Sequence, residues 1–243
     1  MLVLAHLSDT HIDGGTRTQE RTTRALDHIA RLATPPDLVL ITGDITHRGT
    51  PEEYAHARQL LLGPSPILTL PGNHDDRANY RRHLHGLTAS DTPVNAVHRH
   101  GGVVFVLLDS VIPGSNAGEL SAATHTWLDH TLADNADEPV FLCLHHHPVP
   151  LHMPFVDQWP LHGAEKLAAL LERHPNVVAV VCGHAHTPAV TTFANRPLLV
   201  APGLASTVRL AWEEGHPQDY DHPALIAFHT YEHGRITTHF RAV

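Results

Sequence analysis

The chain has 243 residues, a length that fits one α/β domain with a sizeable core, and we predict a single domain over residues 1–243. Its formal net charge of -9 and its single lysine argue against a nucleic-acid partner held through phosphates. No apolar run reaches the roughly 18 residues that a membrane span requires, and no secretory leader pattern opens the sequence. We therefore expect no membrane partner. Both cysteines lie in apolar stretches, so we expect reduced thiols and a cytoplasmic protein.

Strand and helix patterns alternate through the first half of the chain. An apolar strand at 2–7 precedes a helix at 21–32, which ends before Pro35-Pro36. A strand at 38–41, a helix at 51–62 with proline in its first turn, a strand at 67–70 and a short helix at 76–84 follow. Residues 94–97 and 103–109 are predicted to pair antiparallel around Gly101-Gly102.

The second half continues with Ser121 as the predicted N-cap of a helix to Leu132 and a strand at 140–144. Residues 148–162 have prolines, aromatics and no periodicity, so we expect a long irregular loop and a candidate substrate wall. A helix at 163–173 and a strand at 177–182 come next. The remaining third is predicted to be β, with strands at 189–193, 197–201, 224–231 and 235–240.

Five of the expected strands are followed by blocks of metal-ligand residues. The blocks are Asp9-x-His11, Gly43-Asp44, Gly72-Asn73-His74-Asp75, His145-His146-His147-Pro148 and Gly183-His184-Ala185-His186. Ligands in open α/β sheets bind outside the carboxyl ends of the strands, so blocks far apart in the sequence are expected to meet there. In an extended segment residues i and i+2 share a side, which pairs Asp9 with His11 and His184 with His186.

The chemistry of these blocks favours a two-metal site. Carboxylate, imidazole and amide ligands without thiolate suit two divalent or trivalent ions of Mn, Fe or Zn. Taken alone, Asp9-x-His11 is as readily a turn or cap, and Gly43-Asp44 favours an ordinary turn. The ordered set carries the prediction. Most of the 25 histidines must have other roles, and for Asp13 and His47, just beyond the blocks, a solvated loop position is favoured.

In this order the blocks resemble the signature of the calcineurin-like metallophosphoesterases, and most closely the bacterial class III cyclic nucleotide phosphodiesterases, over nearly the whole chain. The resemblance implies an α/β fold: a four-layer α/β/β/α sandwich with a di-metal site at the strand C-terminal ends. It implies that Asp44 bridges the metals. The other implied ligands are Asp9, His11 and His186 for the first metal, and Asn73, His146 and His184 for the second. His146 is chosen because the family pattern is His-x-Pro. That choice leaves His145 and His147 with surface or supporting roles. The resemblance further implies that His74 acts as a general acid or charge contact, with Asp75 fixing its orientation.

The implied activity is metal-dependent hydrolysis of a small phosphodiester, with a 3',5'-cyclic nucleotide as the first candidate, by a metal-bridging hydroxide attacking phosphorus in line. Segments at 108–110, 118–121 and 201–203 resemble the cyclic nucleotide branch. A glycerophosphodiester or broad phosphomonoester hydrolase on the same metals is the alternative. A non-enzymatic metal-binding module is disfavoured because all seven ligands and His74 are present. The physiological substrate, the metals and the assembly state stay open, and a homodimer is compatible with the sequence.

Overall fold

The computed structural model describes all residues 1–243, and two β-sheets form its centre. The first sheet has the order β15-β14-β1-β2-β3. Its parallel strands are β1 (Leu2–Leu7), β2 (Leu38–Thr42) and β3 (Ile67–Leu70), and the C-terminal hairpin of β14 (Leu225–Glu232) and β15 (Arg235–Ala242) pairs antiparallel with β1. The last two strands of the chain therefore complete the sheet that its first strands begin.

The second sheet has the order β10-β11-β9-β7-β5-β4. Its strands are β4 (Ala96–His100), β5 (Val103–Leu107), β7 (Val140–Cys143), β9 (Val177–Cys182), β10 (Ala189–Phe193) and β11 (Arg196–Val200). The pairs β5–β7, β7–β9 and β9–β11 are parallel, so the carboxyl ends of β5, β7 and β9 share one edge. The predicted antiparallel pair around Gly101-Gly102 is β4 with β5.

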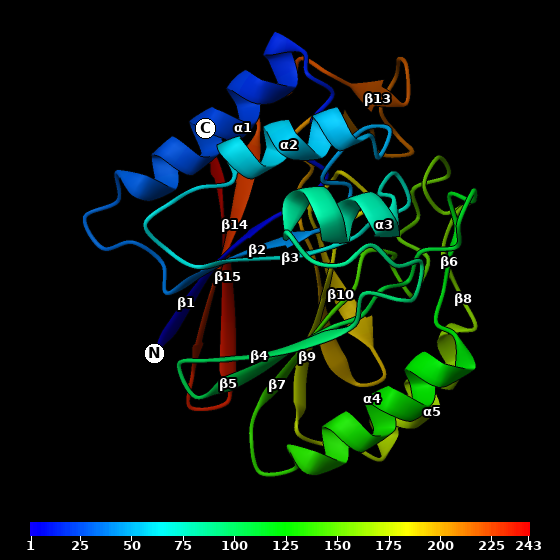
Figure 1. Cartoon of the computed structure of the whole chain (residues 1–243). Coiled ribbons are helices and arrows are strands. Elements are labelled where there is room, and N and C mark those ends of the chain that lie inside the picture. The colour runs from blue at the N-terminus through cyan, green and yellow to red at the C-terminus, as the bar shows by residue number, and fades with distance from the viewer.

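Helices cover the outer faces of both sheets, and Figure 1 shows them on opposite sides of the sheet pair. They are α1 (Thr16–Ala30) and α2 (Pro51–Leu60) on the first sheet, and α4 (Ala122–Asp134) and α5 (Ala164–Glu172) on the second. A separate buried cluster, with Leu4 and Leu40 facing Phe105, Phe141 and Val181, lies between the sheets. The predicted four-layer α/β/β/α sandwich is confirmed.

Local sequence sets the helix ends. Ser121 caps α4 by accepting from the Thr124 backbone N–H at 3.1 Å, and Thr50 caps α2 in a reciprocal arrangement with Glu53. The expected helix at 76–84 is instead a short α3 (Arg77–Asn79) followed by a π-helical turn, η1 (Tyr80–Leu84). Short strands β6 (Gly118–Glu119) with β8 (Leu161–His162), and β12 (Thr207–Val208) with β13 (Gln218–Asp219), brace the loops.

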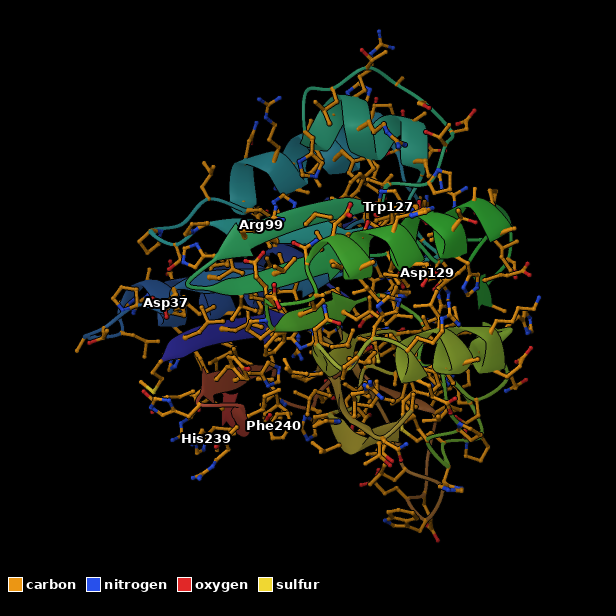
Figure 2. The ribbon with its side chains drawn as sticks, turned by 90° about the horizontal axis from the view of Figure 1, so that it is seen from below. Asp37, Arg99, Trp127, Asp129, His239 and Phe240 are labelled. Atoms are coloured by element: carbon orange, nitrogen blue, oxygen red, sulfur yellow. The ribbon has the colours of Figure 1, made fainter.

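Hydrogen bonds as well as apolar packing hold the helices α4 and α5 on the outer face of the second sheet. In Figure 2 Trp127 and Asp129 lie on α4, with Arg99 on the neighbouring β4. Asp129 accepts from His174 at 2.6 Å and from Arg173 at 3.0 Å, which joins α4 to the end of α5.

None of the helices has the length and apolar character needed to cross a membrane.

A buried pair of histidines links the C-terminal hairpin to β1 within the first sheet. His6 Nδ1 lies 3.0 Å from His229 Nε2, and their outer nitrogens contact the hydroxyls of Thr42 at 2.9 Å and Thr238 at 2.8 Å. Burial lowers the pKa of both imidazoles, that of His229 to about 3. Both rings are therefore neutral in the folded protein.

This pair predicts a loss of stability in acid. Because the folded pKa lies below the unfolded value of about 6.5, the contribution is complete above pH 6.5 and falls as pH drops toward 3. Each ring contributes about 1.4 kcal/mol per pH unit. His229→Gln should therefore reduce the drop in unfolding free energy between pH 7.5 and pH 5 by about 2 kcal/mol, measured by urea unfolding. The exposed His239→Gln (Figure 2) is the control, and equal drops in both variants would contradict the prediction.

Candidate metal centre

The predicted blocks gather between the two sheets at the carboxyl ends of β1, β2, β3, β7 and β9. Residues brought together there include Asp9, His11, Asp44, Asn73, His145, His184 and His186. Asp9 and His145 are fully buried, Asp44 is 2% exposed, and His184 and His186 are each 7% exposed. Such buried polar groups require hydrogen-bonding or charged partners.

At five of these seven residues the backbone is left-handed and not extended. The φ angles are 53° at Asp9, 43° at His11, 48° at Asp44, 67° at His184 and 57° at His186. Residues other than glycine rarely take this conformation, and such strain collects at functional sites. The i, i+2 pairing was predicted from strand alternation, and that reason is wrong. In each pair the two left-handed residues flank a residue that is not left-handed, Thr10 or Ala185.

The first candidate metal position lies among Asp9, His11, Asp44 and His186. His11 Nε2 is 3.2 Å from His186 Nε2 and 3.5 Å from Asp44 Oδ2, and Asp9 Oδ1 is 3.5 Å from His186 Nε2. Asp9 Oδ1 is buried without a hydrogen-bond partner. His186 uses its other nitrogen, Nδ1, on the Ser206 hydroxyl at 2.9 Å, which orients the ring.

The second candidate metal position lies among Asp44, Asn73, His145 and His184. His145 Nε2 is 3.1 Å from Asn73 Oδ1, 3.2 Å from His184 Nδ1 and 3.5 Å from Asp44 Oδ1. His145 Nδ1 lies 2.7 Å from the Thr42 carbonyl oxygen, which can only accept, so Nδ1 carries the proton. With a metal ion bound, Nε2 would direct its lone pair toward the other three side chains, as in a histidine ligand.

Electrostatics at both positions call for positive charge. Burial alone would lower the pKa of His145, but the carboxylates of Asp44 and Asp9 outweigh it and raise that pKa to about 9. Burial alone would raise the pKa of Asp44, yet the positive charge of His145 holds it well below its usual range. A proton on His145 thus neutralises the carboxylates where a cation would. With Asp9 Oδ1 unpartnered and Asp44 directing one oxygen to each position, the donor set fits two metal ions.

His146, which the sequence selected as a ligand, is held by the protein instead. Its Nδ1 lies 2.7 Å from the Ser110 hydroxyl, and its Nε2 lies 3.1 Å from the Asn116 carbonyl oxygen. One nitrogen of His146 does lie within 4.8 Å of His145 and His184 atoms, but both its nitrogens have protein partners. We therefore replace His146 by His145 in the candidate ligand set.

The reason lies in which face of β7 meets the other sheet. Phe141 and Cys143 pack between the sheets, and His145 continues that side toward Thr42. Leu142 and Leu144 pack outward under the helices, and His146 follows them. The sequence prediction applied strand alternation correctly but chose the wrong face of the strand, because it used the spacing to Pro148 to select the ligand.

Matched substitutions test this replacement. His145→Ala should lower bound metal from two ions per chain to about one, because the second position loses a ligand and metal affinity falls steeply with each ligand lost. His146→Ala should keep both ions, although unpairing Ser110 and Asn116 costs stability of about 1–3 kcal/mol. Elemental analysis of the dialysed proteins checks both. Two ions in His145→Ala and one in His146→Ala would restore the original choice.

His74 lies beside both positions without joining either set. Its backbone N–H donates to Asp44 Oδ1 at 2.9 Å, and its ring Nδ1 donates to the His47 carbonyl oxygen at 2.8 Å. The ring packs edge-on against His11, with centroids 4.7 Å apart, and near-parallel to His47 at 5.4 Å. Nε2 is left as the nitrogen available to a substrate.

Asp75 does not orient His74, contrary to the prediction. Its Oδ2 accepts from the Ile45 and Gly72 backbone N–H groups at 3.0 and 2.9 Å. Its Oδ1 accepts from the Thr46 backbone and hydroxyl and from Tyr54 Oη, at 3.1, 3.0 and 2.8 Å. Asp75 therefore ties the two loops that carry Asp44 and Asn73 and acts on the site through the backbone.

Asp75→Asn is expected to lower the unfolding free energy by about 2–4 kcal/mol at pH 7.5, because an amide NH₂ must then face backbone N–H donors. Asp76→Asn is the matched control. Asp76 caps α3 by accepting from the Asn79 N–H at 2.8 Å, and asparagine caps equally well. Chemical unfolding of the two variants measures the difference, and equal stability would contradict the bracing role.

A cavity of about 450 Å³ opens over the candidate ligands. The other lining residues lie near the start of α1 (Asp13, Arg17 and Thr18), in the loop at 148–162 (Phe155, Val156 and Trp159), in the segment around β12 and β13 (Ala205, Ser206, Val208, Gln218 and Tyr220), and in other loops at His47, His74 and Asn116. Asp13 and His47 are exposed, as expected, but both also line the cavity. The sequence prediction did not name Arg17, Trp159 or Tyr220. Only the loop that carries Trp159 had a sequence signal, namely its length and its start at a ligand block.

The chain is similar to known phosphoesterases in sequence and in fold. The family model for calcineurin-like phosphoesterases matches residues 2–188. A probable cyclic nucleotide phosphodiesterase of Rhodococcus erythropolis is 34% identical, covering 90% of this chain and 76% of that protein. A glycerophosphodiester phosphodiesterase of Enterobacter lignolyticus is 32% identical, covering 89% and 82%. Among solved structures, a dimetal phosphatase from Danio rerio has a TM-score of 0.75 at 16% identity, covering 99% and 96% of the two chains. That last likeness speaks for the fold alone.

Proposed function

The chain belongs to the calcineurin-like phosphoesterase family and is a phosphodiesterase, and from that premise we propose that it hydrolyses a small phosphodiester, with 3',5'-cyclic nucleotides first among the candidates. The observation that carries the proposal is the meeting of two carboxylates, an amide and four imidazoles from five strand ends under one cavity. The curated relatives include both cyclic nucleotide and glycerophosphodiester phosphodiesterases, so the second class is the alternative.

Asp9, His11, Asp44 and His186 would hold one ion, and Asp44, Asn73, His145 and His184 the other. When bound, the pair supplies a nucleophile at neutral pH and compensates charge on the phosphoryl oxygens. His74, fixed through its Nδ1, presents Nε2 to the leaving oxygen and delivers a proton or a charge contact there. The walls of the cavity exclude part of the solvent and orient the organic groups of the ester.

A substrate panel with metal-reconstituted protein tests the proposal. The panel compares 3',5'-cyclic nucleotides, 2',3'-cyclic nucleotides, glycerophosphodiesters and phosphomonoesters, with Mn, Fe and Zn loaded separately. We expect the highest kcat/KM on a 3',5'-cyclic nucleotide. Preference for glycerophosphodiesters would select the alternative, and hydrolysis of phosphomonoesters alone would overturn the diester assignment.

A further inference from the structure

One wall of the cavity is aromatic. Phe155 and Trp159 both line it, are half-buried, and meet edge to face with ring centroids 5.4 Å apart at 85°. Val156 and Val208 line the same cavity and are buried. Apolar rings turned into a cavity above polar groups are a feature of sites that bind an organic group, because burying the rings on binding is favourable.

The wall is built before any ligand arrives. Asp157 accepts from the backbone N–H groups of Leu151 and Met153 at 2.8 and 2.9 Å, which closes the loop on itself. Met153 and Val156 lie in the core cluster of the second sheet, and the Pro160 carbonyl oxygen accepts from the Gly118 N–H at 3.1 Å. Phe155 and Trp159 are thus carried on a fixed frame, which reduces the entropy lost when a ligand packs on them.

The charge of the lining restricts which chemical group of a ligand fits the outer part of the cavity, next to a phosphate placed at the metal positions. Arg17 is the only lysine or arginine among the lining residues. Its guanidinium sits 5.0 Å from the centroid of the Tyr220 ring and donates to the Tyr220 carbonyl oxygen. Arg17, held against Tyr220, is therefore the single lysine or arginine in the lining that could meet a second phosphate, whereas Phe155 and Trp159 offer two half-buried rings to an uncharged planar group.

We infer that Phe155 and Trp159 form a stacking site for the nucleobase of a mononucleotide substrate whose phosphate lies at the metal positions. This inference rests on the proposed function and narrows it, because a glycerol or ethanolamine group has no ring to stack. Base–aromatic stacking tolerates any base, so the wall selects ring-bearing diesters without reading one base from another.

Kinetics of matched variants test the inference. Trp159→Ala should raise KM for 3',5'-cyclic AMP by roughly 5- to 150-fold with kcat within a few-fold of wild type, the range expected for one lost stack. Its kcat/KM for glycerophosphoethanolamine should fall by no more than a few-fold, far less than the value for cyclic AMP, and Trp159→Phe should recover most of the loss on cyclic AMP. Trp212→Ala is the control, since Trp212 is 77% exposed and outside the cavity lining. Equal losses on both substrates, or none on cyclic AMP, would overturn the stacking site.

Binding separates this inference from the proposed function. Adenosine 5'-monophosphate should bind the Mn-reconstituted protein more tightly than ribose 5-phosphate and quench tryptophan fluorescence, and Trp159→Phe should lose most of the quenching. Equal affinity for the two probes overturns the stacking site even if diesters are hydrolysed. Tighter binding of the adenosine probe by a protein that hydrolyses no diester keeps the stacking site and removes the proposed function.

Discussion

Replacing Asp44 by asparagine is expected to nearly abolish phosphodiester hydrolysis while the fold persists. Asp44 directs Oδ2 to His11 and Oδ1 to His145, so it is the one side chain shared by both candidate metal positions. Asparagine keeps the shape but brings an NH₂ group to one imidazole lone pair and removes the negative charge. Losing several kcal/mol of metal-borne stabilisation lowers the rate roughly 10³-fold or more.

Asp13→Asn is the control for this variant. Asp13 also lines the cavity, but it is exposed and accepts from the Gly15 N–H at 2.8 Å and the Thr18 hydroxyl at 2.6 Å. Asparagine satisfies both bonds, so near-wild-type rates are expected. Elemental analysis and steady-state kinetics on both proteins give the comparison. Two bound metals and wild-type turnover in Asp44→Asn would remove Asp44 from the site.

His74→Ala is expected to lower kcat by about 10²- to 10⁴-fold with metal content unchanged, the range for a lost general acid or charge contact. The effect should shrink on substrates with good leaving groups, such as aryl esters, because these need no proton. His74 contributes a backbone bond to Asp44, which alanine retains. The loss is therefore assigned to the ring.

His47→Ala is the matched control for His74, because the His47 ring lies near-parallel to that of His74 while its backbone carbonyl makes the hydrogen bond. Its rate should stay within a few-fold of wild type. Loss of a metal ion from His74→Ala would instead make His74 a ligand. A large loss in His47→Ala alone would move the acid role to the neighbouring ring.

Much of the site follows from the sequence because polar residues at strand ends carry their own signal. Asp9, Asp44, Asn73, His184 and His186 each follow an apolar strand, and the carboxyl ends of parallel strands meet at one edge. The strands and the helix capped by Ser121 were predicted for similarly local reasons. The identity of these residues as ligands stays a prediction until metal is measured.

The rest depends on tertiary packing that local pattern does not encode. The choice between His145 and His146 requires knowing which face of β7 meets the first sheet, a fact set by residues on other strands. The role of Asp75 depends on donors at Ile45, Thr46 and Tyr54, about 20 to 30 residues away. The joining of β14 to β1 is equally non-local, with Leu2 opposite Tyr231.

Anomalous diffraction from crystals of the Mn-reconstituted protein tests the central claim most directly. Two manganese peaks are expected about 3.5–4 Å apart, the spacing of two-metal hydrolytic sites. One should lie against Asp9, His11 and His186, the other against Asn73, His145 and His184, with Asp44 touching both. A single peak, or a second peak that leaves His145 uncoordinated, would contradict the account.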